Sequence, residues 1–310
     1  MTSARAPGKL VLSGAYAVLS GAPALVVAVD RYALADSARP ASFLTPEVQA
    51  ALGDRPAPWF DASALREGDQ KLGLGSSAAI LVASLAALEL SDEPTLSDAA
   101  LCARVYERAF VAHRTAQGGG SGVDVAASAY GGVLGARRTV SGALELTRLE
   151  LPSGLHFEVW ACSVSASTSA FLARIAEFAA REPAVHAARI TAQAEAAEAA
   201  LAAIERGSAA EFVPAIARQV ETLTALGEAA GVSIVTPELA QLAQLAAAHA
   251  AAFLPAGAGG GDVAYWVGAG APPASFAARA RALGLSRVQL GLGARGVHAA
   301  SPRNAQDQEP

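Results

Sequence analysis

The stretch Lys71-Leu72-Gly73-Leu74-Gly75-Ser76-Ser77-Ala78-Ala79 runs directly into an apolar helical pattern over 80–90. Its glycines allow a tight turn and a close approach of the backbone to a ligand. The first N–H groups of the following helix, and the positive end of its dipole, favour a bound anion. The stretch therefore predicts a phosphate site at the point where a loop becomes a helix.

The side chains of this stretch also suit a phosphate. Ser76 and Ser77 can cap the helix or turn their hydroxyls toward a phosphate or a phosphate-bound metal ion. Lys71 adds a positive charge, and lysine is scarce, because Lys9 and Lys71 are the only two in the chain. Many glycine-serine segments do no more than cap a helix and close a loop, so this structural interpretation stays open from the stretch alone.

Two other nucleotide-binding patterns fit less well. Gly73-x-Gly75-x-x-Ala78 formally matches the dinucleotide pattern G-x-G-x-x-G/A, but residues 66–70 are polar rather than a buried strand. An acidic residue ending a second strand about 20 residues further on is also missing. The Walker pattern G-x-x-x-x-G-K-[ST] does not occur in the sequence.

Composition narrows the classes of function. A chain of 310 residues can bury a large core and form two lobes. The net charge of -5, without a basic cluster, argues against a nucleic acid partner. Two cysteines without metal-ligand spacing, and a first segment without a signal-peptide layout, predict a cytoplasmic protein. We expect no membrane span, because no run of about 18 strongly apolar residues occurs.

The hydrophobic pattern predicts alternating helices and strands, followed by a helix-rich second half. Thr236-Pro237-Glu238 supplies an N-cap, a proline at the first helical position and an early acid, which predicts a helix to about 252. We expect a tail without order over 301–310. Other expected features are a helix over 97–116, strands over 24–32, 155–164, 263–267 and 288–292, a loop-rich excursion over 36–70, and helix breaks at 182–183, 206–207 and 231.

Three glycine-bearing segments, in this order, resemble the GHMP small-molecule kinases, named after galacto-, homoserine, mevalonate and phosphomevalonate kinases. Ala6-Pro7-Gly8-Lys9 with Gly14-x-Tyr16-Ala17-Val18-Leu19 is similar to the first family motif. Gly73-Leu74-Gly75-Ser76-Ser77-Ala78-Ala79 is similar to the phosphate loop, and Gly257-Ala258-Gly259-Gly260-Gly261-Asp262 to the third motif. The resemblance spans nearly the whole chain.

The resemblance implies an α+β, two-lobed fold with the active site in the cleft. An N-terminal ATP-binding lobe over 1–160 would resemble the second domain of ribosomal protein S5. A helix-rich, ferredoxin-like lobe would cover 161–300.

Within the family, the phosphomevalonate kinase branch is the most similar. Tyr16 stands where mevalonate kinases usually carry His, and His113-x-x-Ala116-Gln117-Gly118 leads into Ser121-Gly122-x-Asp124. Ser165-Ala166-Ser167-Thr168-Ser169 opens the second lobe in a similar way. This branch transfers a phosphoryl group from ATP to the phosphate of 5-phosphomevalonate, giving mevalonate diphosphate and ADP.

Other members of the family remain alternatives. Mevalonate kinases also carry Ser121-Gly122-Val123-Asp124 followed by Tyr130-Gly131-Gly132, so mevalonate is the alternative acceptor. A non-catalytic relative that binds nucleotide or metabolite, and a decarboxylase relative, are further interpretations. The sequence departs from the family pattern at Ala15, where many members have Glu, and at Leu254, where many have Lys.

The chemistry assigns roles to named residues. Asp124 is the candidate base, because its carboxylate follows a glycine-serine turn that the substrate can approach. As an alternative, it would cap the helix that follows. Lys9 would keep Asp124 ionised and neutralise charge on the transferred group.

The binding residues follow from the resemblance. Mg²⁺ would be coordinated by ATP, Ser77 and water. In mevalonate kinases a magnesium-binding Glu stands near this place, where the present sequence has His113. Arg137 and Arg138 are alternatives for the acceptor phosphate, and we expect a monomer or homodimer with only small-molecule partners. The expected ATP-binding residues are Lys71, Gly73, Leu74, Gly75, Ser76, Ser77 and Ala78; the expected acceptor-binding residues are Tyr16, Lys71, Ser121, Gly122, Ser165, Ser167, Thr168, Ser169, Ala258 and Gly259.

Overall fold

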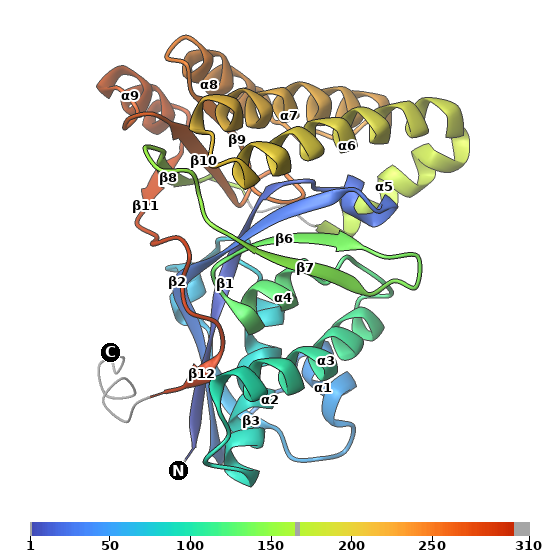
Figure 1. Cartoon of the computed structure of the whole chain (residues 1–310), viewed down its shortest axis with the longest axis vertical. Coiled ribbons are helices and arrows are strands. Elements are labelled where there is room, and N and C mark those ends of the chain that lie inside the picture. The colour runs from blue at the N-terminus through green and yellow to red at the C-terminus, as the bar shows by residue number, and fades with distance from the viewer. Residues whose placement is uncertain (1, 165–167, 301–310) are drawn as a thin grey trace. The chain divides into compact units, whose positions relative to one another are not determined.

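The computed structural model describes residues 2–164 and 168–300. They form two compact units, each assembled from separate stretches of the chain (Figure 1). Unit 1 contains the described residues of Met1–Leu10, Val26–Leu134 and Gly291–Pro310, and unit 2 contains those of Val11–Leu25 and Gly135–Leu290. Helices and sheets occur in both units, which confirms the predicted α+β class. The lobe boundary at 160 stays a prediction, and the tail 301–310 lies outside the described residues.

The largest sheet has the strand order β12-β1-β2-β6-β7, and β3 pairs with β2. β12 lies antiparallel to β1, with His298 opposite Arg5. β2 extends beyond the strand predicted over 24–32, because Leu34 and Ala35 pair with β3. The strands are β1 (Ser3–Ser13), β2 (Pro23–Pro40), β3 (Pro58–Asp61), β6 (Val133–Arg138), β7 (Leu144–Leu149) and β12 (His298–Ala299).

α2 is the central helix of unit 1 (Figure 1). Every residue from Ala78 to Ala87 is buried, and the helix packs against α1, α3, α4 and β3. A helix that is apolar on all sides is expected to be buried in this way. The helix predicted over 80–90 is confirmed, and it begins at Ser76. The other elements of this region are α1 (Pro46–Leu52), η2 (Ser63–Leu65), β4 (Arg66–Glu67), β5 (Gln70–Lys71), α2 (Ser76–Asp92), α3 (Asp98–Ala116) and α4 (Val123–Tyr130).

α3 confirms the helix predicted over 97–116. Ser97 caps it by accepting a hydrogen bond from the N–H of Ala100. Leu101, Val105 and Ala109 are buried at intervals of one helical turn, and His113 continues the same stripe. This register carries a histidine into the interior of unit 1.

The second sheet, in unit 2, is antiparallel with the order β11-β8-β10-β9. β10 is buried along its whole length, because both of its faces are covered. On one face Trp266 packs with Phe276 of α9 and Leu242 of α8. On the other face the hydroxyl of Tyr265 donates to the carbonyl of Leu12. The elements are β8 (His156–Ala161), α8 (Pro237–Ala247), β9 (Ala252–Pro255), β10 (Val263–Gly268), α9 (Ala274–Ala282) and β11 (Ser286–Val288).

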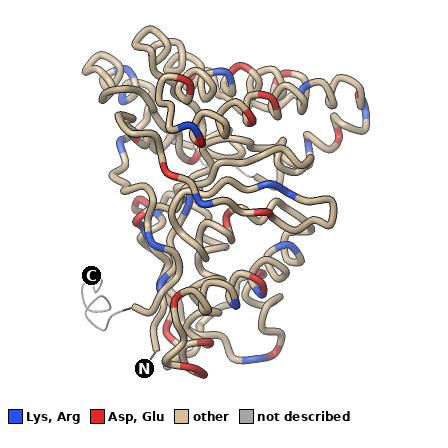
Figure 2. The backbone as a smooth tube through the Cα atoms, in the orientation of Figure 1, with Lys and Arg blue, Asp and Glu red and all other residues tan. Residues whose placement is uncertain are grey.

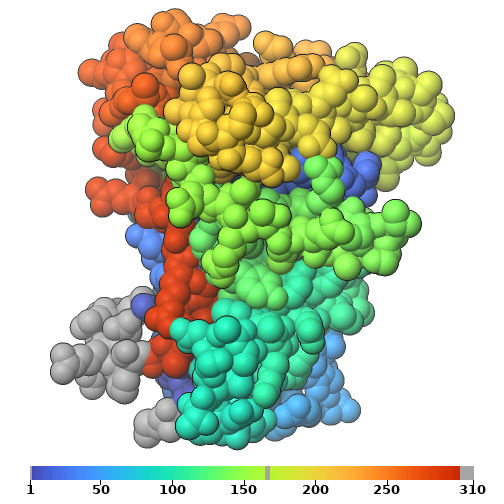
Figure 3. Space-filling model, in the orientation of Figure 1, coloured from blue at the N-terminus to red at the C-terminus, as the bar shows by residue number. Residues whose placement is uncertain are grey.

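Three more helices and a short 3-10 helix belong to unit 2. α6 and α7 pack along one another, and the outer face of α6 is open to solvent (Figure 3). Acidic and basic residues are interspersed along these helices (Figure 2). The predicted breaks are confirmed, because α6 begins at Pro183, Arg206-Gly207 follows α6, and Gly231 caps α7 in the left-handed conformation. The elements are η1 (Ala17–Ser20), α5 (Thr168–Arg181), α6 (Pro183–Glu205) and α7 (Ala209–Ala230).

Two predicted boundaries are wrong. Thr236 caps α8 as expected, but the helix ends at Ala247 rather than near 252. Ala252 instead pairs with Val267 of β10 and begins β9. The strand predicted over 288–292 as the last one corresponds to β11 over Ser286–Val288, since these residues pair with β8, and β12 follows it.

Candidate active site

The glycine loop before α2 alternates buried and open residues. The side chains of Leu72 and Leu74 are fully buried and anchor the loop to unit 1. Gly73 and Gly75 between them have φ angles of 65° and 75°, in the left-handed region that glycine tolerates best. The loop is therefore fixed by its leucines, while its glycine backbone remains partly open.

The start of α2 offers backbone donors to an anion. The first hydrogen bond of the helix runs from the N–H of Ala79 to the carbonyl of Gly75, at 3.0 Å. The N–H groups of Ser76, Ser77 and Ala78 precede that bond, and none of the described side chains caps the helix. These donors, with the helix dipole, suit a phosphate group.

Lys9, on β1, lies against this loop. Its backbone N–H donates to the carbonyl of Leu74 at 2.9 Å, and its ammonium donates to the carbonyl of Gly73 at 3.1 Å. The approach is tight, because a Cβ on Gly75 would lie 3.0 Å from Cε of Lys9. A Cβ on Gly8 would lie 2.9 Å from the carbonyl oxygen of Leu74. The structure thus brings the predicted catalytic lysine to the predicted phosphate loop.

Asp124 occupies the first turn of α4, and its two carboxylate oxygens have different neighbours. Oδ1 accepts a hydrogen bond from the N–H of Val125 at 3.0 Å, but Gly122 rather than Asp124 is the N-cap residue of α4. Oδ2 lies 3.3 Å from Nε2 of His113. The Asp124 side chain is 21% exposed, so its carboxylate is held on two sides and still reaches solvent.

His113 connects Asp124 to further polar groups. Its side chain is only 2% exposed. Nε2 of the ring also lies 3.1 Å from the amide nitrogen of Gln117, which donates to Oε1 of Glu47 at 3.2 Å. A chain of polar side chains therefore runs from Glu47 on α1, through α3, to Asp124 on α4.

A separate hydrogen bond ties α4 to β1. The hydroxyl of Ser128 is buried and donates to the carbonyl of Pro7 at 2.8 Å. Pro7 stands two residues before Lys9, so α4, β1 and the glycine loop are joined by direct contacts. Unit 1 consequently gathers Lys9, the loop and Asp124 in one connected region.

Unit 2 gathers another set of predicted residues around Tyr16. Tyr16 has a φ angle of 65°, unusual for a bulky residue, and its hydroxyl donates to the carbonyl of Ala258 at 2.5 Å. Burial raises the pKa of Tyr16 well above its ordinary value, so the phenol stays protonated and can donate. The first and third glycine motifs thus meet through this bond.

Gln219 of α7 holds the segment before Tyr16. Its amide oxygen accepts from the backbone N–H of Gly14 at 3.2 Å, and its amide nitrogen donates to the hydroxyl of Ser13. Gly14 has no room for a side chain, since a Cβ would lie 2.1 Å from the carbonyl oxygen of Pro23. The buried amide fixes the backbone that presents Tyr16.

The third motif is closely packed inside unit 2. Its Gly260 N–H donates to the carbonyl of Ile234 at 2.8 Å. A Cβ on Gly259 would lie 2.3 Å from the same carbonyl oxygen, and one on Gly260 would overlap the ring of Phe171. These positions therefore require glycine for space as well as for their positive φ angles.

Comparison with known proteins finds a domain match and a similar kinase. Residues 51–132 match the model of the GHMP kinases N terminal domain, which includes the glycine loop, α2 and Asp124. The chain is 29% identical to the phosphomevalonate kinase of a Streptomyces species, over 83% of this chain and 87% of that protein. Residues 51–132 form a GHMP kinase N-terminal domain.

Solved structures share the fold of this kinase. A protein from Listeria innocua superimposes with a TM-score of 0.81 at 22% identity, over 96% of this chain and 99% of the other. The Streptococcus pneumoniae phosphomevalonate kinase in complex with phosphomevalonate and AMPPNP gives a TM-score of 0.76 at 19% identity, over 94% of this chain and all of the other. The kinase is thus an ATP-dependent small-molecule kinase with the GHMP fold.

Several predicted residues lie elsewhere or have other neighbours. Lys71 is exposed in β5, directly before the loop. Thr168 and Ser169 are exposed at the start of α5, and Ser165 and Ser167 lie outside the described residues. Arg137 makes two hydrogen bonds to the carboxylate of Glu198, so its guanidinium is already engaged.

The turn before α4 contains the last two predicted residues. The hydroxyl of Ser121 lies 3.5 Å from the N–H of Val123, the first residue of α4. Gly122 has a φ angle of 77°, and a Cβ there would lie 2.3 Å from the ring of Phe110 on α3. Gly122 therefore permits the close packing that brings Asp124 to α3.

The donor set for a magnesium ion is small. Among residues 2–164 and 168–300, no group of three or more His, Cys, Asp or Glu side chains could hold a metal. The hydroxyl of Ser77, in the first turn of α2, is a hard oxygen ligand of the type that Mg²⁺ uses beside substrate phosphates. A single hydroxyl ligand of this kind fits a Mg²⁺ ion that is coordinated mainly by the nucleotide phosphates.

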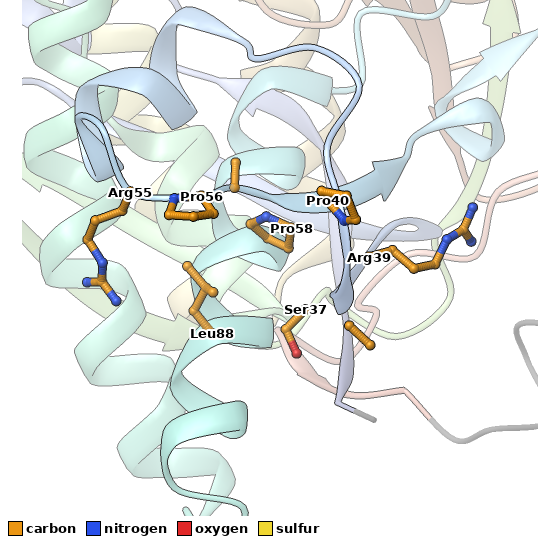
Figure 4. Close-up of a pocket in the computed structure, with 9 residues that line it drawn as sticks. Ser37, Arg39, Pro40, Arg55, Pro56, Pro58 and Leu88 are labelled. Atoms are coloured by element: carbon orange, nitrogen blue, oxygen red, sulfur yellow. The ribbon is translucent and has the colours of Figure 1, made fainter.

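A surface hollow of about 390 Å³ lies elsewhere in unit 1 (Figure 4). Three prolines, Arg39, Arg55 and Leu88 are among its lining residues, and the Arg39 guanidinium already stacks on Trp59, 4.0 Å from the ring centre. None of the predicted catalytic residues lines it.

In the described part of the chain, no helix has the length and apolar character that a bilayer span requires.

Sequence reasoning missed the contacts of His113, Gln117 and Gln219. His113 extends the buried stripe of α3, and Gln117 follows one turn later. That spacing was a usable signal. No local sequence signal points to the contacts of Gln219, since its partners Ser13 and Gly14 are more than 200 residues away.

Proposed function

We propose that this kinase transfers the γ-phosphoryl group of ATP to the phosphate of 5-phosphomevalonate, giving mevalonate diphosphate and ADP. The observation that carries the choice of acceptor is the 29% identity to a phosphomevalonate kinase over 83% of the chain. The motif residues of that branch, Tyr16 and the His113 that precedes Asp124, support the same acceptor.

The contacts in unit 1 support a mechanism based on positioning and charge. The N–H groups at the start of α2 and the Gly73–Gly75 backbone would bind phosphate oxygens of ATP. Lys9 would neutralise negative charge on the transferred group while its other contacts hold the loop. Mg²⁺ would be held by the nucleotide and Ser77, and would neutralise phosphate charge.

Asp124 would act on the acceptor. A phosphate monoester has a second pKa near 6, so most acceptor molecules arrive fully ionised at neutral pH. A phosphate oxygen attacks the γ-phosphorus, and the bond to the bridging oxygen of ADP breaks with its electron pair on ADP. Where the acceptor still carries a proton, that proton passes to the Asp124 carboxylate.

Tyr16, Ala258 and Gly259 would bind the acceptor. The hydroxyl of Tyr16 donates to Ala258, so its oxygen lone pairs are still able to accept a hydrogen bond. Thr168 and Ser169 are exposed hydroxyls at the start of α5 and would serve the same acceptor, together with Ser121 and Lys71.

ADP release with a panel of acceptors tests the proposal. Phosphomevalonate should support turnover at least tenfold faster than mevalonate, mevalonate diphosphate, homoserine or galactose. Mevalonate kinase is the second candidate, because it shares Ser121-Gly122-Val123-Asp124 and Tyr130-Gly131-Gly132. Turnover with mevalonate alone would reject the proposal in favour of that activity.

A further inference from the structure

We propose that His113 is a positioning residue for Asp124, and that its Nε2–H fixes the carboxylate for phosphoryl transfer. The inference rests on the proposed function of Asp124 and adds a residue to it. Three observations on the described residues carry it: the contact distances, the burial of the ring and the capacity of the carboxylate.

The distances leave His113 as the side-chain partner of one carboxylate oxygen. Oδ1 of Asp124 accepts the Val125 N–H, and Oδ2 lies 3.3 Å from Nε2 of His113. An ionised carboxylate can only accept hydrogen bonds, so the hydrogen between Oδ2 and the ring comes from Nε2. Two bonds from different elements then define one orientation of the carboxylate.

The surroundings of the ring favour a proton on Nε2. Nδ1 of His113 is buried, with no hydrogen-bond partner among the described residues. A proton placed on Nδ1 would leave a buried donor unpaired, at a cost of about 1–3 kcal/mol. A proton on Nε2 instead makes a charge-assisted bond to Asp124. The amide nitrogen of Gln117 lies 3.1 Å from Nε2, but it donates to Glu47 and cannot accept a hydrogen bond, so the Nε2 hydrogen has Asp124 as its acceptor.

The Asp124 carboxylate can still accept further hydrogen bonds from a substrate. Its two oxygens offer about four acceptor positions, of which the Val125 N–H and the His113 ring take two. The side chain is 21% exposed, so the remaining lone pairs can accept a proton from a bound acceptor. Loss of the histidine would release one side of the carboxylate without removing the base.

Substitution of His113 tests the role. His113→Leu keeps an apolar side chain in a buried site but removes the donor, and we expect kcat to fall by about 10- to 100-fold, since misplacement of a reacting group by 1 Å can cost 10²-fold. The KM values for ATP and phosphomevalonate should change less than threefold. His113→Gln places an amide N–H near the position of Nε2 and should recover most of kcat. His249→Leu makes the same change at an exposed position and should leave kcat unaltered.

The outcomes separate this inference from the proposed function. Wild-type protein without phosphomevalonate kinase activity would reject the function itself. Active wild type with an unaffected His113→Leu variant, or equal losses in the Leu and Gln variants, would reject the positioning role. If His113→Leu does not fold, ¹⁵N NMR of the wild-type histidines decides, because the inference requires His113 to be protonated on Nε2, and protonation on Nδ1 overturns it.

Discussion

Gly75→Ala should separate the strain of the loop backbone from the position of Lys9. Gly75 has φ 75° and ψ 38°, and a residue with a Cβ in this left-handed conformation costs about 1–2 kcal/mol. The added Cβ would also lie 3.0 Å from Cε and 3.1 Å from Cγ of Lys9. Ordinary contacts are longer, so the lysine must move by a few tenths of an ångström and pull its ammonium from the carbonyl of Gly73.

The backbone strain should lower the free energy of unfolding by about 1–2 kcal/mol. The displaced ammonium should lower kcat/KM by about tenfold, a modest share of the 10²-fold loss that a 1 Å misplacement can cause. Urea unfolding measures the first quantity, and initial rates of ADP release measure the second.

Gly231→Ala is the matched control. Gly231 ends α7 with φ 67° and ψ 35°, nearly the same conformation, and a Cβ there would meet only the guanidinium of Arg174, at 3.6 Å. We expect the same loss of stability with kcat/KM unchanged. Equal activity losses in the two variants, or full activity in Gly75→Ala, would show that the contact between Lys9 and Gly75 does not matter for catalysis.

Three further substitutions test separate parts of the account. Asp124→Asn should keep ATP binding, measured by calorimetry, while turnover falls by about 10² or more, and near-full activity would rule it out as a base. Lys71→Met should raise the KM for ATP or for the acceptor, whereas unchanged KM values would make Lys71 an ordinary surface residue. Burial lowers the pKa of His298, whose Nε2 accepts from Arg5, so the folded state binds its proton less readily than the unfolded chain. This stability is present above about pH 6.5 and is lost as the pH falls through the lowered pKa; the drop in Tm between pH 7.5 and 5.5 should be smaller in His298→Gln, and an equal drop would contradict that origin.

Local signals in the sequence predicted the elements well. The caps at Ser97 and Thr236, Pro183 at a helix start and Gly231 at a helix end each act through residues within one turn, so the sequence shows them directly. The extension of β2 and the end of α8 depend on strand pairing with distant segments. Propensity alone does not contain that information.

In the candidate site, too, some features follow from local sequence and others depend on contacts between distant segments. The glycine loop is one continuous stretch, so its positive φ angles and the start of α2 follow from local residue types. The bond from Tyr16 to Ala258 joins residues 242 apart, and the contact of His113 with Asp124 needs α3 packed on α4. The sequence identified three of these residues as candidates, but only packing gives them their partners.

The central claim is that the acceptor is the phosphate of 5-phosphomevalonate. ³¹P NMR of the product measures this most directly, in a reaction containing ATP, Mg²⁺ and an equimolar mixture of mevalonate and phosphomevalonate. We expect the coupled pair of signals of a diphosphate ester to grow while the monophosphate signal of phosphomevalonate declines, and the Asp124→Asn protein should leave both nearly constant. Growth of a monophosphate signal from mevalonate, with phosphomevalonate unconsumed, would contradict the account.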